Sequence, residues 1–315
     1  MFGNIEMMIK KFKVVAILGP TSSGKSDIAI KLAKDFNGEV ISADSRQIYK
    51  NMNLGTGKVK GKWKKIKNRK IFVSEKIPHH IIDFRSPRGE YNISHFQKDC
   101  FRAVNAIVNR GKLPIICGGT GFWLSAIVDN RSLPQVKPNF VLRKKLNKKT
   151  AEQLFGQLKE LDTERSRSID RRNKVRLIRA IEICKKLGKI PRLEKTAGSK
   201  YQFLQIGIDW PPEKLDKKIK ERLDNRWQSG MVKEVKYLKK KHALSWRKIQ
   251  SFGLIYFWIP EFLRNKIDEK QLKEKVFLAE RNYAKRQRTW FKRDKRIIWQ
   301  NQYPKIKIAV KKFLA

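Results

Sequence analysis

The stretch GPTSSGKS at residues 19–26 most restricts the fold that this chain can adopt. It matches the phosphate-binding loop pattern, in which a Gly-rich turn before a helix directs backbone N–H groups at an anion. Before it, KVVAILG (13–19) is a short β-branched run that predicts a buried strand. After it, SDIAIKLAKDF (26–36) has apolar residues at a spacing of four, which predicts an amphipathic helix. Because both flanking elements are expected, the loop is a functional phosphate site rather than a chance match.

The order strand, loop, helix and strand indicates a right-handed parallel βαβ unit, with EVISA (39–43) as its second strand. Further strands are predicted at 113–119, 201–209 and 295–300, and helices at 94–110, 211–240 and 270–293. The basic stretch KVKGKWKKIKNRK (58–70) is predicted to be a surface loop or a hairpin. The fold class is therefore α/β, with a P-loop-type parallel sheet core flanked by helices.

Residues 129–200 have a different character from the rest of the chain. They contain no convincing strand, they are rich in Lys, Arg, Leu and Glu, and NKVRLIRAIEICKKLGK has a strongly helical pattern. We therefore predict a discontinuous catalytic core with C-terminal helices, made of residues 1–128 and 201–315, and a helical insertion at 129–200.

The charge of the chain favours a polyanionic partner. Lys and Arg number 74 against 29 Asp and Glu, a formal net charge of +45. Nucleic acid rewards such an excess, because each neutralised phosphate releases counterions. The alternative is a lysine-rich composition inherited from the base content of the genome, since the lysines are spread along the chain.

The cysteines and the apolar runs indicate a cytoplasmic protein without a membrane partner. Cys100, Cys117 and Cys184 lie far apart and form no C-x-x-C pair, so neither a zinc site nor a disulfide framework is expected. FGLIYFWI (252–259) is the longest apolar run and is too short to span a bilayer. We expect a monomer.

Two segments could supply side chains to the phosphate loop's cleft. Asp44 in ISADSRQIY follows the second strand, and Thr120 in CGGTGFW follows another. Ligands of open α/β sheets bind at the carboxyl ends of the strands, so both should face the cleft. Asp44 could be a general base, a helix N-cap or a Mg²⁺ ligand, and GGTG could be only a turn. For His79-His80 a structural role is favoured over a metal site, because neighbours on a strand face opposite ways.

Seven motifs in one order carry a resemblance to a known family. They are GPTSSGKS, ISADSRQIY, GTGK (55–58), PHHIIDF (78–84), GKLPIICGGTG, RLIRAIEI (176–183) and AKRQRTWF (284–291). Together they resemble the tRNA dimethylallyltransferases, over nearly the whole chain. That family transfers a five-carbon allyl group from dimethylallyl diphosphate to N6 of adenosine 37, next to the tRNA anticodon.

The resemblance implies roles for particular residues. It places the diphosphate on the loop Gly19, Pro20, Thr21, Ser22, Ser23, Gly24, Lys25 and Ser26, with Ser26 as a ligand of Mg²⁺. It makes Asp44 the catalytic base, puts Thr120 near the target adenosine, and lets Arg226 hold the diphosphate with support from Arg222. The residues that it matches to tRNA contacts are Asp44, Ser45, Arg46, Gln47, Arg176 and Arg179.

Two departures from the family pattern and two rival functions remain. Phe122-Trp123 stand where the family usually has Leu-Tyr, and 245–250 matches poorly. One rival is a P-loop kinase or ATPase acting on or with RNA, in which Asp44 would hold Mg²⁺ or activate a hydroxyl. The other is a non-catalytic RNA-binding protein with a relic loop, against which the intact Lys25 and Asp44 argue.

Overall fold

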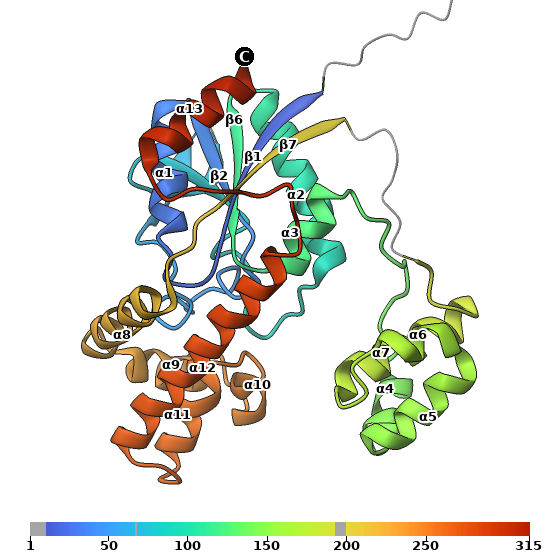
Figure 1. The fold of residues 1–315 in the computed structure, drawn as a ribbon. Coiled ribbons are helices and arrows are strands. Elements are labelled where there is room, and N and C mark those ends of the chain that lie inside the picture. Colours follow the sequence, from blue (N-terminus) through green and yellow to red (C-terminus); the bar gives the residue numbers. More distant parts are fainter. Residues whose placement is uncertain (1–10, 67, 193–199) are drawn as a thin grey trace, which may run out of the picture. The chain divides into compact units, whose positions relative to one another are not determined.

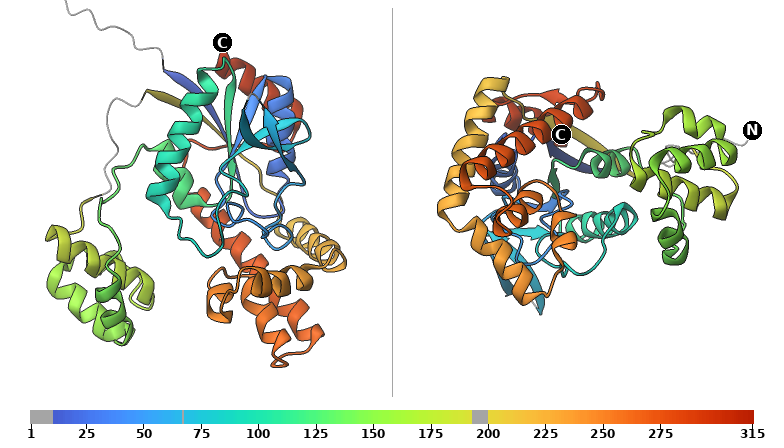
Figure 2. Two further views of the ribbon diagram at one scale, coloured as in Figure 1. Left: turned by 180° about the vertical axis from the view of Figure 1, so that it is seen from behind. Right: turned by 90° about the horizontal axis from the view of Figure 1, so that it is seen from below.

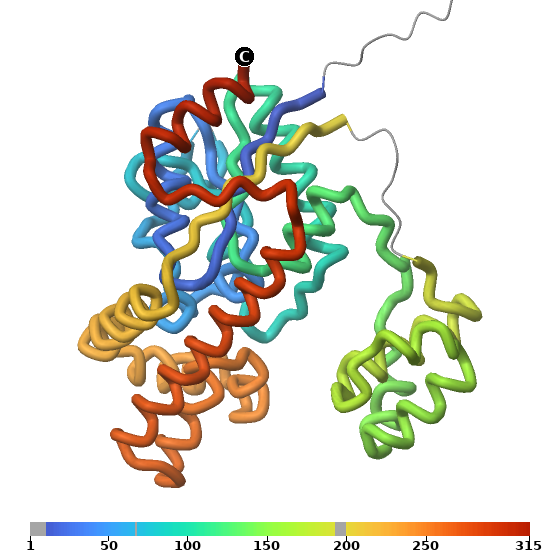
Figure 3. Tube along the Cα trace, viewed as in Figure 1, coloured from blue at the N-terminus to red at the C-terminus, as the bar shows by residue number. Residues whose placement is uncertain are grey.

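The computed structural model describes residues 11–66, 68–192 and 200–315. The chain divides into two compact units, one of residues 1–129 and 198–315 and one of residues 130–197. Figure 3 follows the chain through the larger unit, in which both the early and the late parts of the sequence lie. We call the larger unit the core unit and the smaller one the insertion.

The core unit is built on one eight-stranded sheet in the order β3-β4-β5-β2-β6-β1-β7-β8. The strands are β1 (Phe12–Leu18), β2 (Gly38–Ser42), β3 (Lys62–Ile66), β4 (Arg69–Ser74), β5 (Ile77–His80), β6 (Leu113–Gly118), β7 (Tyr201–Gly207) and β8 (Ile298–Trp299). All neighbours from β5 to β8 are parallel, and β3 and β4 form an antiparallel hairpin at one edge. Parallel strands buried on both faces explain the continuous apolar runs of the sequence.

Helices cover both faces of this sheet (Figure 1). The helices on its faces are α1 (Lys25–Asp35), α2 (Ile93–Val108), α3 (Gly121–Val128) and α13 (Tyr303–Leu314). The other helices of the core unit gather beyond the carboxyl ends of the strands, and they are α8 (Pro212–Gln228), α9 (Met231–Lys241), α10 (Trp246–Gln250), α11 (Ile255–Leu263) and α12 (Glu269–Phe291). Successive strand residues point to opposite faces, so Val14 packs with α2 and α3 while Val15 packs with α1 and α13. This layering places the carboxyl ends of β1, β2 and β6 side by side.

The predicted fold class is confirmed, with corrections to single elements. The expected helix at 211–240 is two helices, because Gly230 has φ 93°, a conformation that glycine adopts without strain. The expected strand at 295–300 is only Ile298–Trp299. Of the two alternatives for the basic stretch 58–70, the structure has the hairpin, whereas β5, α3, α10, α11 and α13 were not predicted.

Within residues 130–192, the part of the insertion that the structure describes, all the named elements of secondary structure are helices, and they lie between residues 140 and 187. Its helices are α4 (Phe140–Asn147), α5 (Ala151–Leu161), α6 (Thr163–Ser168) and α7 (Lys174–Leu187). They enclose an apolar cluster of their own that includes Leu177, Ile178 and Ile181. The residues before the helices, Asn139, Thr150, Asp162 and Asn173, each accept a backbone N–H bond from the first turn, as N-caps do.

Within the described ranges, no helix combines the length and the apolar character that crossing a membrane requires.

Candidate functional site

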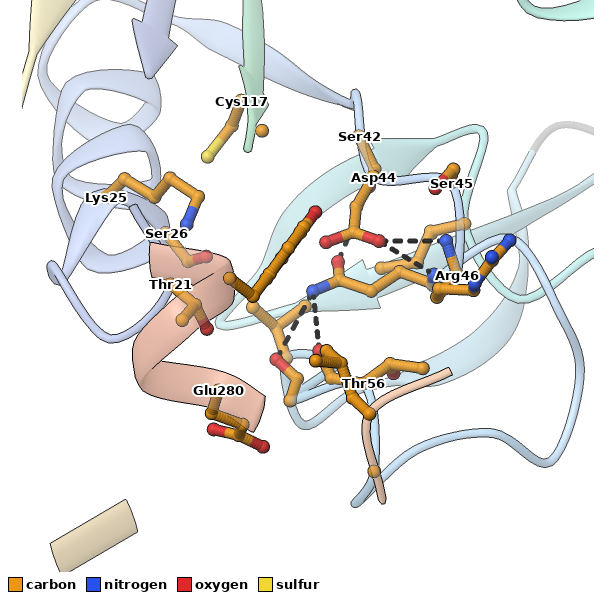
Figure 4. Close-up of a pocket in the computed structure, with 18 of the residues that line it drawn as sticks. Thr21, Lys25, Ser26, Ser42, Asp44, Ser45, Arg46, Thr56, Cys117 and Glu280 are labelled. Atoms are coloured by element: carbon orange, nitrogen blue, oxygen red, sulfur yellow. Dashed lines mark hydrogen bonds between the residues drawn. The ribbon is translucent and has the colours of Figure 1, made fainter. Parts of the chain in front are cut away.

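A cavity of about 310 Å³ lies in the core unit at the carboxyl ends of the parallel strands. Figure 4 shows the phosphate loop and Asp44 turned toward one another across it. Its lining includes Thr21, Lys25, Ser26, Ser42, Asp44, Ser45, Arg46, Gln47, Cys117, Arg222, Arg226, Phe252, Glu280, Tyr283, Arg286 and Gln287. Segments far apart in the sequence therefore meet at the sheet edge where the strand order predicted a ligand site.

Glycine and a left-handed serine shape the phosphate loop. A Cβ on Gly19 would lie 2.2 Å from the carbonyl oxygen of Ile208, so only glycine fits there. Gly24 has φ 88° and immediately precedes α1, and Ser22 has φ 61°. This geometry turns the loop onto the start of α1, where the unpaired N–H groups of the first turn attract an anion.

Three buried polar atoms at this loop have no hydrogen-bond partner among the described residues: Ser22 Oγ, Ser23 Oγ and Arg222 Nε. Buried polar groups in native proteins are normally paired, so such a cluster calls for an explanation. Of the three residues, Arg222 lines the cavity, so an anionic ligand bound there would explain its unpaired Nε.

Lys25 adds a positive charge to the loop. Its Nζ donates to the carbonyl oxygen of Pro20 at 3.0 Å. Desolvation lowers the pKa of Lys25, and the nearby Asp44 carboxylate opposes that shift. A bound diphosphate would oppose it further, because opposite charge stabilises the ammonium form.

Asp44 lies just beyond β2 with one carboxyl oxygen fixed and the other available. Oδ1 accepts from the backbone N–H groups of Arg46 at 2.8 Å and Gln47 at 3.3 Å. Among the described residues, no donor bonds to Oδ2. The carboxylate is therefore held in one orientation by the turn that follows it, with an oxygen left for chemistry in the cavity.

Thr120 and Tyr283 stand next to Asp44. Thr120 Oγ1 accepts the backbone N–H of Ser45 at 3.1 Å, which ties the end of β6 to the end of β2. Burial raises the pKa of Tyr283 to about 12, and the Asp44 carboxylate adds to the rise. The phenol therefore stays protonated and can donate a hydrogen bond in the cavity.

The other residues of the DSRQ segment have protein partners. Arg46 Nε donates to the carbonyl oxygen of Phe252 at 2.8 Å, and its guanidinium lies 5.9 Å from the Phe252 ring centroid. Gln47 Nε2 donates to the carbonyl oxygens of Thr56 and Gly57, both at 3.3 Å. These bonds stiffen the segment that carries Asp44.

The two arginines of α8 differ sharply in their partners. Arg226 is 6% exposed, and Nη2 donates to both carboxyl oxygens of Glu280 at 2.7 and 2.8 Å. Nη1 donates to the carbonyl oxygens of Leu54 and Gly55, and Nε to that of Arg222. A guanidinium has five N–H groups, so all those of Arg226 are in use.

Arg222 has fewer hydrogen-bond partners than Arg226. Its Nη2 donates to Thr21 Oγ1 in the phosphate loop and lies 3.5 Å from Glu280. Desolvation and the neighbouring Arg226 lower the pKa of Arg222, and its buried Nε has no partner among the described residues. Arg222 thus presents free donors toward the loop.

Sequence reasoning missed the contribution of α12. Gln287 Oε1 accepts the backbone N–H of Thr21 at 2.8 Å, and Gln287 Nε2 donates to the carbonyl oxygen of Gly119 at 2.7 Å. This buried amide joins the phosphate loop to the GGTG turn. The motif AKRQRTWF contains Gln287, so a signal was present, but nothing local assigns it a role.

In the insertion, the two arginines expected to contact tRNA also differ. Arg176 is exposed on α7 and forms no ion pair with the described residues. Arg179 Nη1 bonds to Glu182 at 2.5 Å and Nη2 to the carbonyl oxygen of Val136 at 2.9 Å. Arg143 binds the same buried Glu182, so Arg179 belongs to a packed ion-pair cluster.

His79, His80 and Cys117 have structural surroundings. His80 Nε2 lies 2.6 Å from Glu39, and the His79 ring packs against Phe72. Burial raises the pKa of Cys117 to about 11, which keeps that thiol protonated. The described residues contain no group of three or more His, Cys, Asp or Glu side chains that could hold a metal ion.

The fold and the cavity define a P-loop α/β protein that can grip a diphosphate beside an oriented carboxylate. The model of the IPP transferase family matches residues 47–294. The chain belongs to the IPP transferase family, which confirms the resemblance to tRNA dimethylallyltransferases.

Relatives and solved structures agree with this assignment. The chain is 36% identical over 290 residues to "tRNA dimethylallyltransferase 1" of Syntrophus aciditrophicus, covering 91% of this chain and 92% of that protein. It is 34% identical to the tRNA dimethylallyltransferase of Halothermothrix orenii, covering 98% and 95%. A tRNA isopentenylpyrophosphate transferase structure from Staphylococcus epidermidis matches with TM-score 0.68 and 29% identity, covering 96% and 99%. A eukaryotic dimethylallyltransferase described as acting on tRNA matches with TM-score 0.73 and 27% identity, covering 89% and 69%.

Proposed function

We propose that this protein transfers the dimethylallyl group of dimethylallyl diphosphate to N6 of adenosine 37, next to the anticodon of tRNA. The observation that carries the proposal is the cavity in which residues of the phosphate loop face Asp44, whose Oδ2 has no donor among the described residues. The substrates are inferred from family membership. The cavity offers the phosphate loop for the diphosphate and Asp44 for the adenine.

The diphosphate half of the substrate fits the phosphate loop. The backbone N–H groups at the start of α1 point out of the helix end, Lys25 offers a charge, and Arg222 lines the cavity with an Nε that has no partner among the described residues. Negative charge grows on the diphosphate as the C–O bond breaks, so these donors stabilise the transition state more than the ground state. Arg226 acts through Glu280, which neutralises part of the arginine pair and keeps Arg222 against Thr21.

The donor set also fits Mg²⁺. Mg²⁺ in phosphate sites takes few protein ligands and keeps several waters and phosphate oxygens. The hydroxyl of Ser26, with the diphosphate itself, meets that need, and a larger cluster of acidic residues is not required. When bound, the ion would neutralise charge on the leaving diphosphate.

The adenine half of the reaction needs a base. N6 is a poor nucleophile because its lone pair is delocalised into the ring, so its proton must be accepted as the new bond forms. As N6 bonds to the terminal allyl carbon, the bond from that carbon to the diphosphate oxygen breaks and the N6 proton moves to Asp44 Oδ2. The N–H groups of Arg46 and Gln47 orient the base, and the Asp44 carboxylate contributes to the raised pKa of the neighbouring Tyr283.

The acceptor must be turned out of the anticodon loop to reach the cavity, as happens to bases modified in their stack. Asp44, Ser45, Arg46 and Gln47 line the path on the β2 side. Arg176 is exposed on the insertion and suits a phosphate contact with the tRNA.

The direct experiment incubates unmodified tRNA with labelled dimethylallyl diphosphate and Mg²⁺, and then analyses the nucleosides by mass. A dimethylallyl group on adenosine without ATP hydrolysis is expected. ATP turnover with no labelling would favour the P-loop kinase or ATPase, and a tRNA shift in a gel without labelling would favour a binding protein.

Asp44→Asn tests the base. The amide keeps an oxygen for the Arg46 and Gln47 N–H bonds but is a far weaker proton acceptor, so tRNA should still bind while transfer is lost. A general base contributes about 10²–10⁴-fold in rate, which sets the expected loss. Transfer at the normal rate would remove Asp44 from this role.

A further inference from the structure

The hairpin of β3 and β4 is a basic surface of the core unit that the cavity does not use. We propose that the tip of this hairpin, carried by Lys64, Lys65, Arg69 and Lys70, binds the phosphate backbone of the RNA substrate. The proposal rests on the proposed function only for the identity of that RNA.

The hairpin presents positive charge without internal neutralisation. The sequence between residues 58 and 74 contains no Asp or Glu. Lys64, Lys65, Arg69 and Lys70 are exposed, and none has an acidic partner among the described residues. Lys58, at the base, is different, because it is buried against Asp83 at 2.6 Å.

One cross-strand pair is electrostatically unfavourable in the free protein. Lys65 lies directly opposite Lys70 in the antiparallel register, so both side chains project from the same face. Like charges at such positions destabilise a hairpin. An anion bound between them would turn this repulsion into attraction for both lysines.

The strand register places the tip at the end of the sheet where the parallel strands have their carboxyl ends, which is the end that carries the cavity. Phe72 pairs with His79, and His79 pairs with Val40 of β2. Because β4 runs against β5, the residues before Phe72 extend toward the carboxyl ends of the parallel strands, and Lys70 lies level with Ser42. The strands between them are roughly 5 Å apart, so Lys70 lies roughly 10–15 Å to the side of the start of the Asp44 segment. That separation is within the span of a bound anticodon stem-loop.

The base of the hairpin is fixed to the segment that carries Asp44. Trp63 Nε1 donates to Asp83 Oδ2 at 2.9 Å, and the backbone N–H of Asp83 donates to the carbonyl oxygen of Gln47 at 2.9 Å. The Trp63 ring also meets Phe72 edge to face, at 6.0 Å between centroids. The base of the hairpin is therefore anchored beside the cavity, in the sheet that Figure 2 shows from two further sides.

A competing explanation is that lysines on an edge strand only prevent pairing with another sheet. β3 is that edge strand, so the alternative must be tested. A lysine-to-glutamate substitution separates the two explanations. Glutamate still prevents pairing of the edge strand by its charge, but it repels phosphate.

The experiment measures binding of an unmodified tRNA transcript to the full chain by fluorescence anisotropy between 50 and 200 mM salt. The variants are Lys65→Glu and Lys64→Glu/Lys65→Glu. The matched control is Lys311→Glu/Lys312→Glu on α13, which changes the net charge equally. That helix ends beside Lys13 at the start of β1, and the amino ends of the parallel strands lie at the end of the sheet opposite the cavity.

We expect the Lys64→Glu/Lys65→Glu variant to lose about tenfold or more in affinity, with a salt slope smaller by about one for each phosphate contact removed. The control should lose much less. Lys65→Glu should also keep or raise the melting temperature, because it faces Lys70 with opposite charge. Equal losses in the hairpin and control variants, or no loss in the hairpin variants, would overturn the proposal.

The outcome is independent of the proposed reaction. If the unsubstituted protein labels tRNA but the hairpin variants bind normally, only the hairpin proposal fails. If the hairpin variants lose binding but the unsubstituted protein transfers nothing, only the proposed reaction fails.

Discussion

Two helices of this protein, α8 in the core unit and α7 in the insertion, each carry two arginines one turn apart. In both, one arginine makes close hydrogen bonds to a buried glutamate, and the other makes only a long contact of 3.5 Å to it or none. On α8, Arg226 forms an ion pair with Glu280, and Arg222 donates a hydrogen bond to the phosphate loop. On α7, Arg179 belongs to Glu182 and Arg176 is exposed.

The two pairs differ in where the glutamate comes from. Glu182 lies three residues after Arg179 in the same helix, so that ion pair is local. Glu280 lies on α12, 54 residues after Arg226, and reaches it only when α8 and α12 pack together. A buried glutamate thus decides which arginine is free to bind an anion, and only the local one is visible in the sequence.

The largest expected effect is on catalysis. Arg222→Gln should lower the transfer rate by about hundredfold or more, because a donor to the leaving diphosphate is lost. Thermal stability should change little. The measurement is transfer at saturating tRNA, with Arg264→Gln, a surface arginine paired with Glu261, as the matched control. A rate within about twofold of the parent would show that Arg222 does not touch the diphosphate.

Arg226→Gln should act mainly on stability. Removing it leaves the buried Glu280 with the single, longer contact to Arg222 at 3.5 Å, and breaking a buried ion pair by removing one partner costs about 3–5 kcal/mol. Denaturant unfolding measures the loss. The double variant Arg226→Gln/Glu280→Gln should recover much of the lost free energy of unfolding. If its loss equals the sum of the losses of the two single variants, the ion-pair explanation is contradicted.

In the insertion, the free arginine should matter for binding and the paired one for stability. Arg176→Ala should weaken tRNA binding several-fold, with a salt slope smaller by about one. Arg179→Ala should lower stability by about 1–2 kcal/mol, since Arg143 still binds Glu182. Anisotropy titrations at several salt concentrations and thermal melts separate the two. A salt-independent defect in Arg176→Ala would argue against a phosphate contact.

The smallest effect concerns Glu39, a third buried glutamate with cationic partners, away from the cavity. Desolvation alone would raise its pKa, but hydrogen bonds from His80, Arg110 and Lys112 outweigh that and lower the pKa of Glu39 to about 2. Because the folded-state pKa is below the usual value, the stabilisation is complete above about pH 4.5 and is lost as pH falls through about 2.

Arg110→Gln should therefore lower the melting temperature at pH 6 by a margin that shrinks as the pH approaches 2. Melting curves of parent and variant across that range check it. A margin that stays constant with pH would mean that Arg110 stabilises the fold through packing rather than through Glu39.

Most of the core unit could be predicted from local patterns. The βαβ unit and the P-loop follow from short apolar runs around one Gly-rich turn, and the helical character of the insertion follows from its periodicity. The errors fall where local patterns are ambiguous. β5 contains a proline and two histidines, and Gly230 divides a continuous helical pattern into two helices.

The sequence alone determined that the phosphate loop and Asp44 meet, because the carboxyl ends of parallel strands lie at one edge of a sheet. Tertiary structure alone decided which arginine faces that loop, that Gln287 joins the loop to the GGTG turn, and that the basic hairpin projects at the same edge. The physical reason is the separation along the sequence of the residues that interact. Strand and helix patterns arise between residues a few positions apart, whereas the partners of Arg226, Gln287 and Phe72 are set by packing between distant segments or by strand register.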